Sequence, residues 1–121
     1  MNGSAPATRR YCLALDLKND PQLIAEYEGY HEEVWPEIIG SIGASGIEDM
    51  EIYRVQDRLV MIMEVSEDFS FAAKAQADAT NPRVQEWEEL MWRFQKPLPG
   101  SEPGEKWIPM TRIFKLGEGP R

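Results

Sequence analysis

The apolar residues of this chain switch several times between alternate positions and a three- to four-residue period, and this order of patterns constrains the fold most. Over residues 11–17, Leu13, Leu15 and Leu17 alternate with small or polar residues, which predicts a strand. A helical period follows from Leu23 onward. Along the whole chain the patterns predict strands at 11–17, 47–55, 59–66 and 107–116, and helices at 21–34, 36–42, 70–79 and 82–95.

Proline and glycine positions set the expected helix boundaries. Asp20 followed by Pro21 predicts a helix start, because aspartate caps free backbone N–H groups and proline is tolerated in the first turn. Pro36 interrupts this helix and begins a second one, since proline suits a first turn but not a helix interior. Gly43 and Gly46 are expected to end the second helix.

The resulting order, β-α-β-β-α-β, is that of the ferredoxin-like fold. Residues 56–58 are expected to form the turn of a hairpin between the middle two strands. We therefore expect an α+β domain with an antiparallel four-stranded sheet and helices on one face. A single domain is expected at residues 9–117, with a disordered tail at 1–8 and a flexible C-terminus at 118–121.

The strand predicted at residues 59–66 is apolar on both faces. Leu59 and Met61 lie on one side, and Val60 and Ile62 lie on the other. Helices on one face of the sheet cover only one of these sides. The second side must therefore meet a ligand pocket, a second subunit or both, and a homodimer packed through the sheet is the simplest expectation.

Charge and composition exclude several classes of partner. The chain has 13 Lys+Arg and 21 Asp+Glu, a net charge of −8, which disfavours nucleic acid and membrane surfaces. Its one cysteine, Cys12, has no partner for an internal disulfide. No apolar run approaches the ~18 residues of a membrane span. Residues 1–8 lack the apolar core of a signal peptide, so we expect a cytoplasmic protein.

The chain has a single histidine, His31, four residues after Tyr27. At this spacing the two rings project from the same side of one helix. Tyr27 could then hydrogen-bond a ligand hydroxyl while His31 exchanges a proton with it, because an unperturbed imidazole titrates close to neutral pH. The alternative is half-buried packing in which each polar tip is merely satisfied.

The chain lacks the sequence motifs of several common enzyme and ligand-binding classes. The chain has no G-x-S-x-G, no Gly-rich phosphate loop and no G-x-G-x-x-G. One His and one Cys do not make a zinc site. Asp16, Glu32, Glu33 and Glu37 could contribute to an oxygen-rich metal site, but acidic residues on helix surfaces usually face solvent. We therefore expect no metal and no cofactor, and chemistry on a small neutral molecule.

Residues 27–37 read Tyr-x-x-x-His-x-x-x-Trp-Pro-Glu, which resembles the signature of the L-rhamnose mutarotase family. The resemblance covers residues 10–116, and relatives in the same superfamily include L-fucose mutarotases. Its further matching positions are Gly46, Ile52, Tyr53, Asn81, Pro82, Val84, Gln85, Trp87, Met91, Trp107, Ile113, Phe114 and Leu116. The resemblance implies a cofactor-free isomerase that interconverts the α and β anomers of a 6-deoxy-L-hexose (L-rhamnose or L-fucose), and a homodimer of the dimeric α/β-barrel type.

The resemblance also implies roles for individual residues. His31 would be the acid/base group, and Tyr27 would orient a sugar hydroxyl or share the proton transfer. The implied substrate-binding residues are Arg10, Trp35, Met50, Trp87 and Glu88. Four of them have an alternative role: Arg10 as surface charge, Trp35 in shaping the helix break, Met50 in the core and Glu88 as a residue that faces solvent.

Two positions depart from the family pattern. Glu88 follows Trp87 where the family has a second tryptophan, and Met50 stands where it has a tyrosine. Both positions belong to the pocket wall in the family, so the reaction class is kept while the identity of the sugar stays open. Trp92 lies close to the Glu88 side of its predicted helix and could supply the aromatic surface that Glu88 lacks.

Two other functions remain open at this point. A cofactor-free monooxygenase of the dimeric ferredoxin-like type would also pair aromatic residues with a histidine, although the Trp-Pro-Glu segment argues against it. A non-catalytic sugar-binding module would use the same pocket without accelerating any reaction. The fold alone does not separate these functions.

Overall fold

A computed structural model describes residues 8–117, so the predicted C-terminus at 118–121 and residues 1–7 of the predicted tail at 1–8 lie outside the described residues, whereas Thr8 begins a strand. Its strands are β1 (Thr8–Leu17), β2 (Ile47–Val55), β3 (Arg58–Ser66), β4 (Gln95–Lys96) and β5 (Ile108–Pro109). Its helices are α1 (Pro21–Glu32), α2 (Pro36–Ala44), α3 (Phe71–Ala79) and α4 (Pro82–Trp92).

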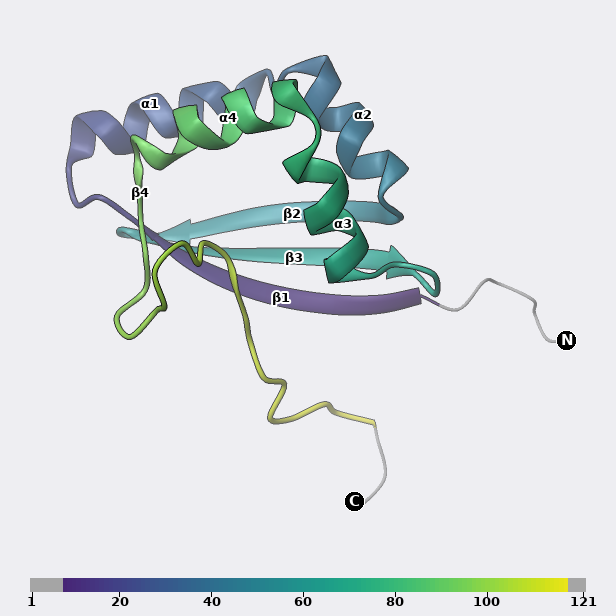
Figure 1. The fold of residues 1–121 in the computed structure, drawn as a ribbon. Helices are drawn as coiled ribbons and strands as arrows, with labels where there is room; N and C mark the ends of the chain where they lie inside the picture. Colours follow the sequence, from purple (N-terminus) through teal and green to yellow (C-terminus); the bar gives the residue numbers. More distant parts are fainter. Residues whose placement is uncertain (1–7, 118–121) are drawn as a thin grey trace, which may run out of the picture.

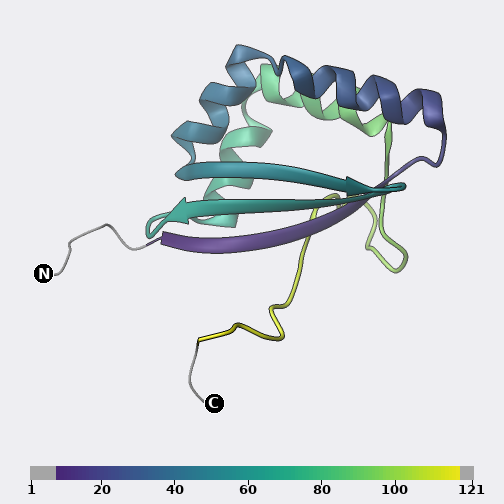
Figure 2. The same cartoon turned by 180° about the vertical axis from the view of Figure 1, so that it is seen from behind.

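The sheet is antiparallel with the order β2-β3-β1-β4, and β5 also pairs with β1. Helices α1 to α4 lie on one face of this sheet, and the opposite face carries no helix (Figures 1 and 2). This arrangement confirms the predicted α+β, ferredoxin-like fold. Strand β2 is at the edge of the sheet, with α1 above it (Figure 1).

Side-chain caps begin the helices where the sequence predicts them. The Oδ1 atom of Asp20 accepts hydrogen bonds from the backbone N–H groups of Gln22 at 2.9 Å and Leu23 at 3.2 Å. Asn81 caps α4 in the same way. These bonds satisfy N–H groups that a helix leaves free in its first turn.

The end of α2 differs from the prediction. Gly43 lies inside this helix, which continues to Ala44. Gly46 follows with φ +97°, and a Cβ atom there would lie 2.9 Å from Oγ of Ser66. The chain therefore needs glycine at residue 46 to turn into β2, whereas Gly43 has no such role in ending α2.

Two adjoining apolar clusters form the core between sheet and helices. The first cluster consists of Leu17, Tyr27, Ile38, Leu59, Val84, Trp87, Met91 and Phe94. The second consists of Leu13, Ile47, Met61, Met63, Val65 and Phe69. Trp107 packs against both. Tyr27 of α1 therefore belongs to the core, and Leu23 and Ile24 of the preceding turn pack against the same cluster.

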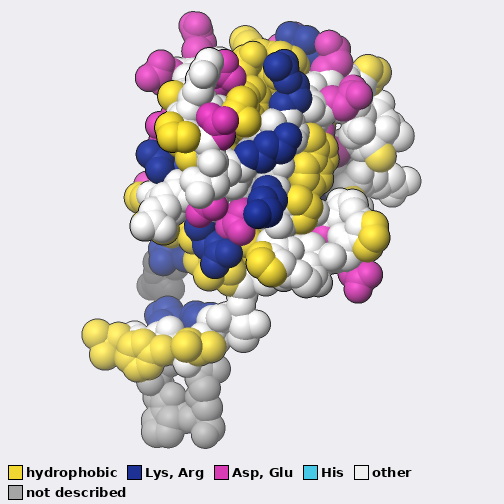
Figure 3. Space-filling view, turned by 90° about the vertical axis from the view of Figure 1, so that its left-hand side faces the viewer, with side chains coloured by type: hydrophobic (Ala, Val, Ile, Leu, Met, Phe, Trp, Pro, Cys, Tyr) yellow, Lys and Arg dark blue, Asp and Glu magenta, His cyan; other side chains and the backbone are white. Residues whose placement is uncertain are grey.

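The predicted strand at residues 107–116 is confirmed only at Ile108 and Pro109 and is otherwise wrong. Only Ile108 and Pro109 pair with β1, and the chain then leaves the domain (Figure 1). The exposed fractions are 94% for Ile113, 75% for Phe114 and 84% for Leu116. Figure 3 shows hydrophobic side chains gathered on this departing segment. Its apolar residues thus find no partner among the described residues of the same chain.

The predicted helix at residues 82–95 is too long. Helix α4 ends at Trp92, and Phe94 turns into the core, where its backbone oxygen accepts a hydrogen bond from the N–H of Lys18 at 2.8 Å. Gln95 and Lys96 then form the short strand β4 beside β1. Burial of Phe94 therefore takes precedence over continuing the helix.

Candidate active site

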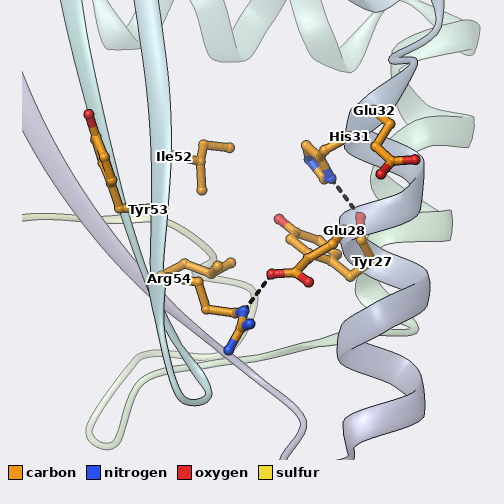
Figure 4. Close-up of a pocket in the computed structure, with 8 residues that line it drawn as sticks. Tyr27, Glu28, His31, Glu32, Ile52, Tyr53 and Arg54 are labelled. Carbon is orange, nitrogen blue, oxygen red and sulfur yellow. Dashed lines mark hydrogen bonds and ion pairs between the residues drawn. The ribbon is translucent and has the colours of Figure 1, made fainter.

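A cavity of about 380 Å³ lies between α1 and the edge strand β2. Its volume is at the small end of the range of about 300–1,000 Å³ for ligand pockets. It is lined by Tyr27, Glu28, His31, Glu32, Ile52, Tyr53, Arg54 and Leu59. Figure 4 shows Ile52 extending from β2 toward α1, and Tyr53 extending from the opposite side of the strand.

His31 is held by the helix that carries it. Its Nδ1 atom lies 2.8 Å from the backbone oxygen of Tyr27, one turn earlier in α1 (Figure 4). A carbonyl oxygen only accepts hydrogen bonds, so Nδ1 must carry the proton in this contact. In the neutral ring Nε2 is then an acceptor, which is the form that a general base requires.

Tyr27 is buried and keeps its proton. Its side chain is 3% exposed, and its hydroxyl oxygen accepts a hydrogen bond from Nε2 of Gln95 at 3.2 Å. Burial raises the pKa of Tyr27 to about 12; the charge of Glu88 adds to this shift and the Gln95 hydrogen bond opposes it. At neutral pH the hydroxyl is therefore a hydrogen-bond donor and not a base.

The rings of Tyr27 and His31 pack together, as their spacing predicts. Their centroids are 4.5 Å apart at an interplanar angle of 42°. The ring of Trp87 contacts His31 edge-on at 5.8 Å, and Trp35 contacts Trp87 at 5.0 Å. The guanidinium of Arg83 lies 3.8 Å from the centroid of a Trp35 ring. Trp87 and Trp35 are thus layered beside His31 and do not line the cavity.

Glu88 is occupied by an ion pair with Lys106. The Lys106 side chain is mostly buried, and this burial lowers its pKa, although Glu88 works in the opposite direction. Its Nζ atom also lies 4.7 Å from the ring centroid of Trp92. Glu88 and Trp92 therefore belong to one charged and aromatic group outside the cavity wall.

Arg10 and Met50 are also not brought to the cavity. Arg10 is exposed, with Nη2 3.9 Å from a carboxylate oxygen of Glu64. It alternates along β1 with core residues, so it faces the side of the sheet without helices. Met50 is half-buried and packs against the second core cluster.

Glu28 and Arg54, which line the cavity, and Gln95, which donates a hydrogen bond to Tyr27, were not predicted as site residues. Glu28 lies three residues before His31 in α1, a spacing that places both on one helix side. Arg54 follows Ile52 by two residues in β2, and alternate residues of a strand share one face. These spacings are signals that point to both residues. Gln95 carried no such signal, because the sequence predicts a helix at that position.

Metal and membrane features were searched in the described part of the chain. No group of three or more His, Cys, Asp or Glu side chains there could hold a metal ion. Asp16 instead accepts hydrogen bonds from Arg58 at 2.7 and 3.1 Å. Within residues 8–117, none of the helices combines the length and apolar character that crossing a bilayer requires.

Comparison with known proteins shows which family this chain is similar to. The model of the family described as L-rhamnose mutarotase matches residues 10–116. An L-fucose mutarotase from Xanthomonas campestris pv. campestris is 57% identical over 112 residues, which cover 91% of this chain and 90% of that protein. An L-rhamnose mutarotase from Jannaschia sp. is 25% identical over 103 residues, covering 85% of this chain and 95% of that protein.

Two solved structures share the fold. The crystal structure of an L-rhamnose mutarotase from Formosa agariphila has a TM-score of 0.66 at 21% identity, covering 89% of this chain and 98% of that one. Tetracenomycin F2 cyclase from Streptomyces glaucescens, a type-II polyketide cyclase, has a TM-score of 0.55 at 16% identity, covering 93% and 99%. Since the family model spans nearly the whole described domain, the chain belongs to the L-rhamnose mutarotase family of carbohydrate isomerases.

Proposed function

We propose that the chain interconverts the α and β anomers of a 6-deoxy-L-hexose, with L-fucose preferred over L-rhamnose, by cofactor-free general acid/base catalysis. The observation that carries this proposal is the hydrogen bond between Nδ1 of His31 and the backbone oxygen of Tyr27. It leaves Nε2 as the acceptor beside a cavity of monosaccharide scale, next to the protonated hydroxyl of Tyr27.

The proposed reaction moves protons only. Nε2 of His31 takes the proton of the anomeric hydroxyl, the bond between C1 and the ring oxygen breaks, and its electron pair stays on the ring oxygen. Tyr27 stabilises that oxygen by donating a hydrogen bond, and the proton on His31 is then delivered to it. After rotation about the C1–C2 bond, the same steps in reverse close the ring on the other face of C1. Sugar and protein both end with the atoms and electrons they began with.

The acceleration that this reaction requires is modest, because mutarotation also occurs in water. General acid/base catalysis by a positioned side chain supplies about 10²–10⁴-fold. A single histidine with a fixed tautomer, in a site that binds one sugar, is sufficient for a rate acceleration of this size. The net charge of −8 is compatible with a neutral substrate.

The choice of sugar is supported by the identities. The relative with 57% identity is named an L-fucose mutarotase, whereas the Jannaschia protein named for L-rhamnose is 25% identical. The family pattern places a second tryptophan at position 88, where this chain has a glutamate paired with Lys106. An altered group at this position supports a sugar other than L-rhamnose as the preferred substrate.

We assign the remaining predicted residues by their contacts. Trp87 and Trp35 are proposed as positioning residues, because the ring of Trp87 contacts His31 and the ring of Trp35 contacts Trp87. Glu88 is proposed to act on Tyr27 through its charge. Direct sugar contacts by Arg10 and Met50 stay predictions, since neither residue lines the cavity in this structure.

The experiment is saturation-transfer NMR between the α and β signals of L-fucose, L-rhamnose, D-galactose and D-ribose. We expect catalysed exchange that is fastest with L-fucose and lost in His31→Ala. Exchange no faster than in buffer, with sugar binding retained, would instead support the non-catalytic binding module. Oxygen uptake with phenolic substrates would support the monooxygenase.

We also propose a homodimer formed through the side of the sheet that lacks helices. Apolar side chains on that side include Cys12, Tyr53, Val55, Val60 and Ile62. The exposed apolar residues at 110–116 likewise contact no core of their own chain. A second copy supplies complementary surfaces to both at once. Sedimentation equilibrium should give twice the chain mass of 13.9 kDa, and a concentration-independent monomer would contradict the dimer.

A further inference from the structure

The cavity has an ion pair at its rim that the reaction described above does not use. Nε of Arg54 in β2 donates to Oε2 of Glu28 in α1 at 2.6 Å (Figure 4). Both residues line the cavity. Within residues 8–117 this pair is the only hydrogen bond or ion pair between α1 and β2.

The pair has unused hydrogen-bonding capacity. Nη1 of Arg54 donates to the backbone oxygen of Gln56 at 2.8 Å, whereas Nη2 makes no hydrogen bond to the described residues. Oε1 of Glu28 likewise accepts none from them. The side chains are 34% and 52% exposed for Arg54 and Glu28 respectively, so a ligand in the cavity has access to both.

Folding stability does not account for this pair. Exposed ion pairs add little to stability, because both groups are well solvated without each other. The two side chains nevertheless meet at a cavity wall, with a donor group and an acceptor atom left over on adjacent positions. That arrangement matches two neighbouring sugar hydroxyls, one of which accepts from a guanidinium while the other donates to a carboxylate.

We propose that Arg54 binds the 4-hydroxyl group and Glu28 the 3-hydroxyl group of the sugar and that the pair selects the configuration there, an inference that rests on the proposed mutarotase function. Glu28 lies three residues before His31, about 4.5 Å along the helix axis. When the anomeric carbon lies at His31, the sugar hydroxyls that reach Glu28 and Arg54 must therefore be ones on ring carbons further from C1. In L-fucose the 3- and 4-hydroxyls are cis and reach the pair together, whereas in L-rhamnose they are trans.

The test uses Arg54→Gln and Glu28→Gln in the full chain, with Lys74→Gln as the matched control. Lys74 forms an ion pair with Asp78 within α3, away from the cavity. Exchange of L-fucose anomers is measured by saturation transfer over a range of sugar concentrations. Binding of L-fucose is measured separately by NMR titration of the backbone amides.

We expect each cavity variant to raise KM and Kd for L-fucose by about 10-fold or more, as for loss of a hydrogen bond to a charged group. The effect should fall mainly on KM, because the pair does not touch the reacting atoms. Wild-type protein should bind 4-deoxy-L-fucose as weakly as Arg54→Gln binds L-fucose, and the substitution should not weaken binding of the deoxy sugar further. Lys74→Gln should match the wild type.

Unchanged KM and Kd in both cavity variants would overturn the proposal and leave the pair as a structural tie. If wild-type protein accelerates exchange of none of the sugars, the proposed function fails. The titration with L-fucose still decides whether Arg54 and Glu28 form a sugar-binding pair, so the two failures are distinguishable.

Discussion

The backbone oxygen of Tyr27 accepts a hydrogen bond from Nδ1 of His31, so one helical turn of α1 determines which nitrogen of the neutral imidazole carries the proton and leaves Nε2 as an acceptor. Asparagine at position 31 could still donate to this oxygen, and glutamine could occupy the volume of the ring, but neither transfers a proton near neutral pH. We therefore expect His31→Asn and His31→Gln to reduce catalysed anomer exchange by about 10²–10⁴-fold. Circular dichroism should show an unchanged fold. Exchange above one-tenth of the wild-type rate in either variant would remove His31 from proton transfer.

Tyr27 should make stability depend on alkaline pH. Its pKa is about 12 in the folded chain, against about 10 for an unfolded tyrosine. The folded state thus holds the phenol proton more tightly, and this contribution is fully present below pH 10 and is lost as the pH rises through about 12. Two pKa units correspond to about 3 kcal/mol.

The measurement is the free energy of unfolding in urea for wild type and Tyr27→Phe between pH 8 and pH 12. We expect the difference between the two proteins to shrink above pH 10. A difference that stays constant over this range would show that Tyr27 titrates alike in the folded and unfolded states.

Removing the charge of Glu88 should shift two pKa values. Glu88 raises the pKa of Tyr27 and also raises that of Lys106, which burial lowers. In Glu88→Gln both pKa values should therefore fall: Tyr27 moves toward its ordinary value, and Lys106 moves further from its own. NMR titration of the Lys106 side chain and of the Tyr27 ring reports each group. An unchanged Tyr27 pKa would separate Glu88 from the active site.

Gly46→Ala should destabilise the fold. The alanine would have to adopt φ +97°, and its Cβ would lie 2.9 Å from Oγ of Ser66. A non-glycine residue in this backbone region costs about 1–3 kcal/mol. Gly40→Ala is the matched control, because Gly40 lies in α2 with no atom within 4 Å of a new Cβ and alanine favours a helix by about 0.5–1 kcal/mol. Thermal unfolding should therefore place the two variants on opposite sides of the wild type.

The sequence predicts the main elements because apolar periodicity marks buried faces and capping residues mark helix starts, although α3 has no buried residue. The β1, β2 and β3 runs and the capped helix starts at Pro21 and Pro82 follow this rule. The segment 110–116 breaks it, since its apolar residues are exposed. An alternating apolar pattern predicts that one side of a segment is buried, but it does not identify the surface that buries it.

The site is predictable to the extent that it lies on one element. Tyr27 and His31 meet because both belong to α1, and helical geometry relates them. The pairing of Glu28 with Arg54 depends on the separation of α1 and β2, which no local pattern contains. Arg10 is the reverse case: its alternation with core residues already puts it on the other side of the sheet, although the family resemblance suggested a sugar contact.

The turn between β2 and β3 lies outside the cavity but contacts a residue of the cavity wall. Gln56, its first turn residue, is the only non-glycine residue with positive φ in the described chain, at +53°. This left-handed backbone presents the carbonyl oxygen to which Nη1 of Arg54 donates. The handedness of one residue outside the cavity thus helps to orient a cavity-wall guanidinium. A substitution at Gln56 that disfavours positive φ is therefore expected to displace the guanidinium of Arg54 without changing any residue of the cavity wall.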